Sequence, residues 1–163
     1  MPTSRDQAAA VRANLEALLA GVARDLALEV AANLTAACPV DTGHARRNFV
    51  PSIGAPHDGE DDGAAQAAGQ AELLTYKIGD GPVYVTNNAP YIDRLILGSS
   101  AQRPAGWDLV AVDAAVADVQ QRYDGLRIDV TSSSDVSARG AGAAAGVAAA
   151  YSPFGASGSE GDE

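Results

Sequence analysis

The chain has 163 residues and a mass of 16.5 kDa, and its 11 basic and 21 acidic residues give a formal net charge of -10. This length suits one ordinary domain with a tail and is too short for two full-sized domains. The acidic balance argues against a protein whose main task is to grip nucleic acid phosphates or an anionic membrane surface.

Small side chains make up much of the apolar content, because the chain has 35 Ala and 17 Gly but only 5% aromatic residues. The core must therefore depend on a limited set of Leu, Val, Ile and Tyr side chains. The single cysteine, Cys38, excludes an internal disulfide and a cysteine-rich metal site. The sequence nowhere has the run of about 18 apolar residues that a membrane-spanning helix needs, so we expect a soluble protein without a membrane partner.

The first predicted element is a long amphipathic helix over residues 4–37. Ser4 and Gln7 have the spacing of a capping box, and apolar residues then recur at every third or fourth position. Pro39 ends the helix because a proline disfavours helical backbone in the residue before it. At about 1.5 Å per residue this helix is about 45 Å long, which exceeds the width of a small domain. We therefore expect part of its apolar face to meet a partner.

The segment after this helix predicts a turn, a strand, a loop and a weak helix. Pro-Val-Asp-Thr-Gly at residues 39–43 is a turn, and residues 45–53 predict a first strand. Pro51 places the far end of this strand either at an edge of the sheet or at its exit from the sheet. Residues 54–63 are acidic and rich in Gly and Pro, which predicts a solvated loop. Residues 64–77 contain good helix formers with few large apolar groups, which predicts a second helix.

The best strand in the sequence is Val-Tyr-Val-Thr at residues 83–86, and its composition predicts a central place in the sheet. Residues 87–90, Asn-Asn-Ala-Pro, predict a fixed corner between this strand and a short helix at residues 91–97, in which side-chain amides satisfy free backbone groups. Apolar spacing predicts a further helix over residues 107–123. Residues 126–130 alternate apolar and charged side chains, which predicts a last strand.

Residues 132–163 are dominated by Ala, Gly and Ser and cannot bury enough apolar area to offset their ordering entropy. We expect this tail to be ordered only by partners, and residues 1–131 to form the domain. The predicted fold class is α+β. In it, the N-terminal helix and the helix at residues 107–123 cover one face of a small, mainly antiparallel sheet.

Asp41, Thr42 and Gly43 form the tripeptide that carries the catalytic aspartate of aspartic proteases, in which two such residues share a proton and activate water. Ile-Leu-Gly at residues 96–98 matches a second element of the short, dimeric proteases. A protease aspartate follows a buried strand, however, whereas a helix and Pro39 precede Asp41. Because of this difference, a homodimeric aspartic protease that uses Asp41 is kept only as the alternative hypothesis.

The remaining polar residues indicate neither a metal site nor a cofactor site. His44 and His57 have neither the helical i, i+4 spacing nor the paired-strand frame that presets ligand geometry. Arg46 and Arg47 form a small basic patch. On such an acidic chain this patch favours a protein interface over nucleic acid binding.

Two stretches of the sequence together resemble one protein family. They are Pro-Val-Asp-Thr-Gly-His-Ala-Arg-Arg-Asn-Phe at residues 39–49, and residues 83–107 with Thr-Asn-Asn-Ala-Pro-Tyr, Leu-Ile-Leu-Gly and Gln-Arg-Pro-Ala-Gly. Both resemble the neck or tail-completion proteins of long-tailed phages, the family that includes lambda minor tail protein Z. At residues 96–97 the chain has Ile-Leu, where that family often has an acidic and then an aromatic residue. The residues that match the family pattern, and that the resemblance marks as motif or interface positions, are Asp41, Thr42, Gly43, Arg46, Arg47, Phe49, Asn87, Asn88, Pro90, Tyr91, Leu95, Gly98, Gln102, Pro104, Gly106 and Trp107.

The resemblance implies a structural virion protein without enzymatic activity or cofactor. It implies a ring at the head-tail neck or tail-completion junction, assembled in the host cytoplasm, through which DNA passes only as cargo. The implied partners are further copies of the chain, expected to form a hexamer, together with the tail terminator and neighbouring connector or tail-tube proteins. A second alternative is an adaptor that is not part of a virion.

Overall fold

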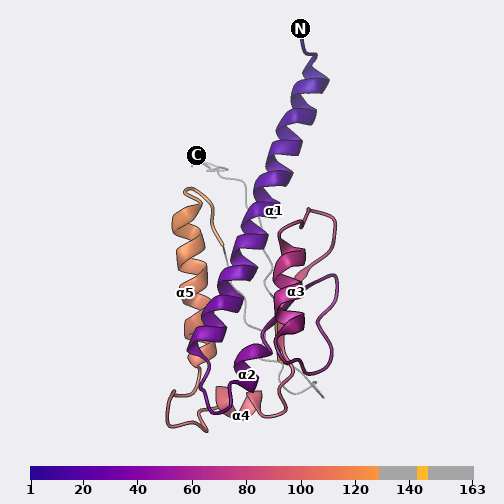
Figure 1. Ribbon diagram of the computed structural model, residues 1–163. Helices are drawn as coiled ribbons and strands as arrows, with labels where there is room; N and C mark the ends of the chain where they lie inside the picture. The colour runs from indigo at the N-terminus through magenta and orange to yellow at the C-terminus, as the bar shows by residue number, and fades with distance from the viewer. Residues whose placement is uncertain (129–142, 147–163) are drawn as a thin grey trace, which may run out of the picture.

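The computed structural model describes residues 1–128 and 143–146. Within these residues it has an α+β architecture, as predicted, with the elements α1 (Ser4–Ala37), α2 (His44–Arg47), β1 (Val50–Ile53), α3 (Ala64–Leu73), β2 (Val83–Asn87), α4 (Ile92–Ile96), α5 (Trp107–Arg122) and β3 (Ala143–Gly146). Figure 1 shows α5 and α3 beside α1, with the short α2 and α4 together near one end of the molecule.

The three strands form one antiparallel sheet in the order β1-β2-β3. Val50 lies opposite Thr86, and Tyr84 lies opposite Gly146. The predicted central strand is thus confirmed as β2. Pro51 lies in the edge strand β1, where its missing N–H costs no ladder hydrogen bond.

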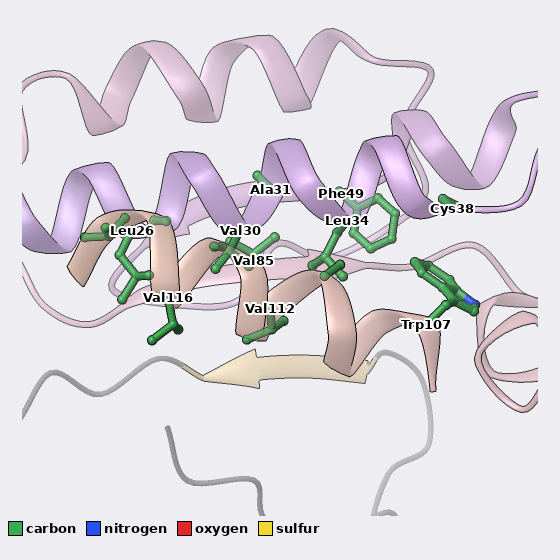
Figure 2. Close-up of a cluster of buried hydrophobic side chains, with 14 of the residues drawn as sticks. Leu26, Val30, Ala31, Leu34, Cys38, Phe49, Val85, Trp107, Val112 and Val116 are labelled. Carbon is green, nitrogen blue, oxygen red and sulfur yellow. The ribbon is translucent and has the colours of Figure 1, made fainter. Parts of the chain in front are cut away.

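The core lies between the second half of α1, the sheet and α5 (Figure 2). Leu26, Val30 and Leu34 come from α1 at helical spacing, and they meet Val116 of α5 and Val85 of β2. Each of these side chains is buried. Because α1 contributes to this cluster over several turns, it is the element against which the rest of the domain packs.

The first half of α1 projects beyond every other described element (Figure 1). Residues 1–18 are exposed throughout, including the aliphatic side chains of Val11, Leu15 and Leu18, which are 67%, 40% and 46% exposed. The projecting part is about four turns long, and an isolated helix of about 15 residues is only marginally stable in water. The apolar periodicity of α1 therefore continues well past the core that it serves within one chain.

The start of α1 differs from the prediction by one residue. Thr3 caps the helix in place of Ser4, with its hydroxyl accepting from the Asp6 N–H at 3.3 Å while the Asp6 carboxylate accepts from the Thr3 N–H at 2.8 Å. Ser4 already belongs to the helix. The Thr3 hydroxyl, and after it the Thr3 N–H, hold the pKa of Asp6 below its ordinary value.

The predicted first strand over residues 45–53 is wrong in its first part, because His44–Arg47 form the helical turn α2 and β1 begins only at Val50. Gly43 has a φ of 79°, which turns the chain into this helix. The Asn48 amide then donates to the His44 carbonyl at 2.9 Å and holds the end of the turn. The helix α3 also ends at Leu73 and not at residue 77.

The predicted strand over residues 126–130 is wrong where the structure describes it, since residues 126–128 are not in a strand. The Ile128 carbonyl accepts from the Gln120 side chain at 2.9 Å, so this segment is tied to α5. The third strand is β3, which lies inside the segment that we expected to be ordered only by partners. The rest of that segment, residues 132–142 and 147–163, lies outside the described residues.

Gly69 marks the closest approach of α3 to the sheet, because a Cβ at this position would overlap the Pro51 carbonyl oxygen. We predict that Gly69→Ala lowers the free energy of unfolding by about 1–3 kcal/mol, since backbone must move to relieve the overlap. Gly21→Ala is the matched control in α1, where the nearest atom, the Tyr123 hydroxyl, lies at 3.4 Å. It should change the stability little or raise it by up to about 1 kcal/mol. Urea unfolding measures both, and equal effects would contradict the tight contact.

Candidate functional site

Six of the motif residues line one cavity of about 340 Å³ between the turn at residues 39–43 and α4. These residues are Asp41, Thr42, Gly43, Tyr91, Leu95 and Gln102. We call this cavity the motif pocket. The two stretches of sequence that carry the family resemblance, which are far apart along the chain, therefore meet in space.

Gln102 joins the two sides of the motif pocket. Its side-chain oxygen accepts from the Val40 N–H at 2.9 Å, and its side-chain N–H donates to the Val40 carbonyl at 2.7 Å. A glutamine amide that pairs with both polar groups of one residue imitates a neighbouring strand. The turn after α1 and the loop after α4 are thus held together by one side chain.

Arg46 closes the end of α1. Its guanidinium donates to the Cys38 carbonyl at 3.1 Å and to the Ala36 carbonyl at 3.5 Å. The last turn of α1 has no basic residue of its own, so Arg46 supplies the positive charge that the negative end of the helix dipole favours. Burial raises the pKa of the neighbouring Cys38 thiol, while the charge of Arg46 opposes that rise.

Asn87 holds the corner between β2 and the segment that leads to α4, and its side chain is only 3% exposed. Its amide donates to the Ala45 carbonyl at 2.7 Å, and its side-chain oxygen accepts from the Ala89 N–H at 3.0 Å. The prediction that side-chain amides satisfy the backbone at this corner is confirmed. The same residue connects α2 to β2.

Two further asparagines fasten the acidic loop at residues 54–63. Asn88 donates to the carbonyls of His57 and Gly59, both at 2.9 Å. Asn48, which is 1% exposed, donates to the Asp61 carbonyl at 2.8 Å and accepts from the Asp61 N–H at 2.7 Å. The loop thus has fixed attachment points on the domain.

Asp61 starts α3, and neither its role nor that of Asn48 was predicted from the sequence. Its carboxylate accepts from the N–H groups of Gly63 at 2.9 Å, Ala65 at 2.7 Å and Gln66 at 3.3 Å. Burial alone would raise the pKa of Asp61, but these backbone donors together outweigh it and hold the pKa below its ordinary value. An aspartate just before a run of helix formers is a capping signal that could have identified it.

A second corner, between α4 and α5, contains Leu95, Gly98 and Trp107. The Trp107 indole donates to the Leu95 carbonyl at 2.9 Å, and its ring meets Phe49 edge to face at 6.4 Å. Gly98 has a φ of 85°, and a Cβ there would lie 2.9 Å from the Ala105 nitrogen. Glycine is therefore required at this position both by conformation and by space.

The motif residues not yet described are Arg47, Pro90, Pro104 and Gly106. The Gly106 N–H donates to the Ile96 carbonyl at 2.9 Å. Pro90 and Arg47 are exposed, and Pro104 lines an open groove between α1 and α5. Most motif residues therefore act by fixing backbone segments against one another.

The geometry around Asp41 differs from that of an aspartic protease. Asp41 lies exposed in the turn after α1, and within the described residues it has no hydrogen bond or ion pair. It does not follow a strand, which is where a protease places its aspartate.

A histidine and an acid do meet nearby, with His44 Nε2 and Glu60 Oε2 2.7 Å apart. Across residues 1–128 and 143–146, however, the structure has no group of three His, Cys, Asp or Glu side chains that could hold a metal ion. None of the helices in this part of the chain has the length and apolar character needed to cross a membrane.

Comparison with protein-family models, with curated proteins and with solved structures finds no match to this chain.

We predict that Asn87→Ala lowers the free energy of unfolding by about 1–3 kcal/mol, because it leaves the buried Ala89 N–H without a partner and removes one of the two donors to the Ala45 carbonyl, which keeps the Asn48 N–H. Asn88→Ala is the control at the neighbouring position. It should cost clearly less, since the carbonyls that it frees lie in the acidic loop, where water can replace the amide. Thermal and urea unfolding measure the two variants. The role of Asn87 is contradicted if Asn88→Ala costs as much.

The lowered pKa of Asp61 predicts a pH-dependent contribution to stability. Because its pKa in the folded chain lies below the ordinary value of 3.8, the carboxylate stabilises the folded state above pH 3.8, and this contribution is lost as the pH falls through the lowered value. Asp61→Asn should therefore be less stable than the wild type at neutral pH, and the difference should narrow below pH 3.8. A stability difference that is constant over this pH range would contradict the claim that the ionised Asp61 carboxylate stabilises the start of α3.

Proposed function

We propose that the chain is a structural subunit of a phage neck or tail-completion ring, as its sequence resemblance implies. The observation that supports this proposal best is that the motif residues hold backbone segments of the chain together. The side chains of Gln102, Arg46 and Asn87 bond to backbone atoms of the same chain and together build a rigid corner, which is a structural use of these residues.

The shape of the subunit also supports the proposal. A ring of identical subunits needs two different faces on each subunit, so that one copy can bind the next through a heterologous contact. The compact core and the projecting half of α1 provide unlike surfaces on one chain (Figure 1). Further copies of the chain, in an expected hexamer, are therefore its first proposed partners.

The charge agrees with a role beside passing DNA. With a net charge of -10, the subunit repels phosphates, so a ring of such subunits lets DNA move without holding it. The tail terminator and neighbouring connector or tail-tube proteins are the other proposed partners. The proposed location is the virion neck or tail.

The proposal is tested in a phage that carries this gene. Without the gene, we expect heads and tails that fail to join or tails that are not completed, and the wild-type gene supplied in trans should restore normal particles. Antibodies against the chain should label the neck or the adjoining end of the tail in electron micrographs. Normal particles without the gene would contradict the proposal and favour an adaptor outside the virion.

The alternative of an aspartic protease has its own test. We predict that Asp41→Asn restores particles as well as the wild-type gene does, because no peptide-cleaving activity depends on this carboxylate. Purified wild-type chain is incubated with a peptide library, with and without pepstatin. Pepstatin-sensitive cleavage that disappears in Asp41→Asn would overturn the structural proposal.

A further inference from the structure

The projecting half of α1 depends on helix formation alone. We call residues 4–19 the arm. Its polar side-chain contacts, which are those of Thr3 with Asp6 at its start and of Arg12 with Glu16, join residues three or four positions apart in the chain. Among the described residues, no other element lies beside the arm (Figure 1). Packing against the domain therefore contributes little to its stability.

The domain begins to hold α1 a few residues after the arm ends. Val22 and Leu26, each 1% exposed, start the buried face of the helix. The Tyr123 hydroxyl, just past the end of α5, donates to the Asp25 carboxylate at 2.7 Å. One turn further on, the Arg122 guanidinium lies 3.3 Å from the carboxylate of Glu29. From residue 25 onward, α1 is thus held both by its buried side chains and by polar contacts with the end of α5.

The one glycine of α1, Gly21, lies at this boundary between the arm and the held part of the helix. Neither space nor backbone conformation requires a glycine there. A Cβ at Gly21 would meet the Tyr123 hydroxyl at 3.4 Å, which is an ordinary contact, and the backbone is not in the left-handed region. By contrast, a Cβ at Gly69 or Gly98 would lie too close to backbone atoms.

The effect of Gly21 is therefore its effect on the helix. Glycine extends a helix about fivefold less readily than alanine does. The four residues before it, Ala-Leu-Leu-Ala at residues 17–20, are all strong helix formers. Gly21 is thus the weakest helix former in this stretch, and it lies where support from the domain begins.

The position of Gly21 gives it control over the whole arm. Starting a separate helix within the arm is costly, so the arm becomes helical mainly by extension of the part of α1 that the domain already holds. This extension runs from residue 25 towards the N-terminus and must pass through Gly21. A low helix propensity at this one residue therefore lowers the helical population of every residue before it.

We propose that Gly21 is a conformational boundary in α1. Unfolding of the arm stops there, and the low helix propensity of glycine sets the fraction of molecules in which the arm is helical. The arm is thereby poised between helix and coil while residues 25–37 stay fixed in the domain. A contact that binds only the helical arm shifts this equilibrium towards the helix. The inference concerns a single subunit and does not depend on the proposed function.

Three variants of the full chain test the boundary. Gly21→Ala strengthens the helix at the boundary. Ala17→Gly weakens it at the end of the arm next to the boundary, and Ala8→Gly is the matched control at the far end. Ala8 and Ala17 are both exposed, so all three variants should fold. Hydrogen exchange in the dilute monomer measures the rates along α1, and far-ultraviolet circular dichroism measures the total helix content.

We expect Gly21→Ala to slow the exchange of amides throughout residues 4–20 by up to about fivefold and to raise the helix content, with no change in residues 25–37. Ala17→Gly should speed exchange throughout residues 4–17 and lower the helix content. Ala8→Gly should speed exchange only in residues 4–11, because the helix reaches residue 8 last when it extends from the domain.

Three results would overturn the proposal. The first is exchange in the wild-type arm that is as slow as in residues 25–37, which would show that the arm is stable without support. The second is an effect of Gly21→Ala that is confined to residues 21–24. The third is an equal effect of Ala8→Gly and Ala17→Gly on residues 12–17, which would show that the arm does not extend from the domain.

Discussion

The structure depends on one continuous helix that is longer than the core it serves. Over its second half, α1 packs on the sheet and on α5, and the side chains that face these elements are buried. Over its first half the same periodicity continues with no described neighbour. A helix gains most of its stability from packing of its apolar face, so the projecting half has a physical reason to bind another molecule.

Several of the motif residues hold the C-terminal end of α1 in place. Arg46 binds the last carbonyls of the helix, Gln102 fixes the turn that follows it, and Asn87 connects α2 to the end of β2. These contacts use side chains whose partners are fixed backbone atoms, so a change of residue type would leave buried or helix-end groups unsatisfied. The ring subunit proposed above would need such a rigid corner between its helix and its sheet.

Much of the fold could be predicted because its signals are local. The periodicity of α1, the proline that ends it and the β-branched run of β2 each determine their own element, and the structure confirms them. The wrong predictions concern segments whose structure depends on contacts with residues far away in the sequence. Asn48 bonds to α2 and to Asp61, which favours a helical turn where the local sequence suggested a strand, and β3 comes from a segment with little apolar surface. The motif residues were identified from resemblance, but their meeting around one pocket needed the structure.

Hydrogen exchange followed by mass spectrometry tests the central claim, that the first half of α1 lacks support until copies associate. In the dilute monomer we expect amides of residues 4–19 to exchange rapidly while those of residues 20–37 are protected. At concentrations where the chain associates, residues 4–19 should become protected. Equal protection of both halves of α1 in the monomer, or no change on association, would contradict the account.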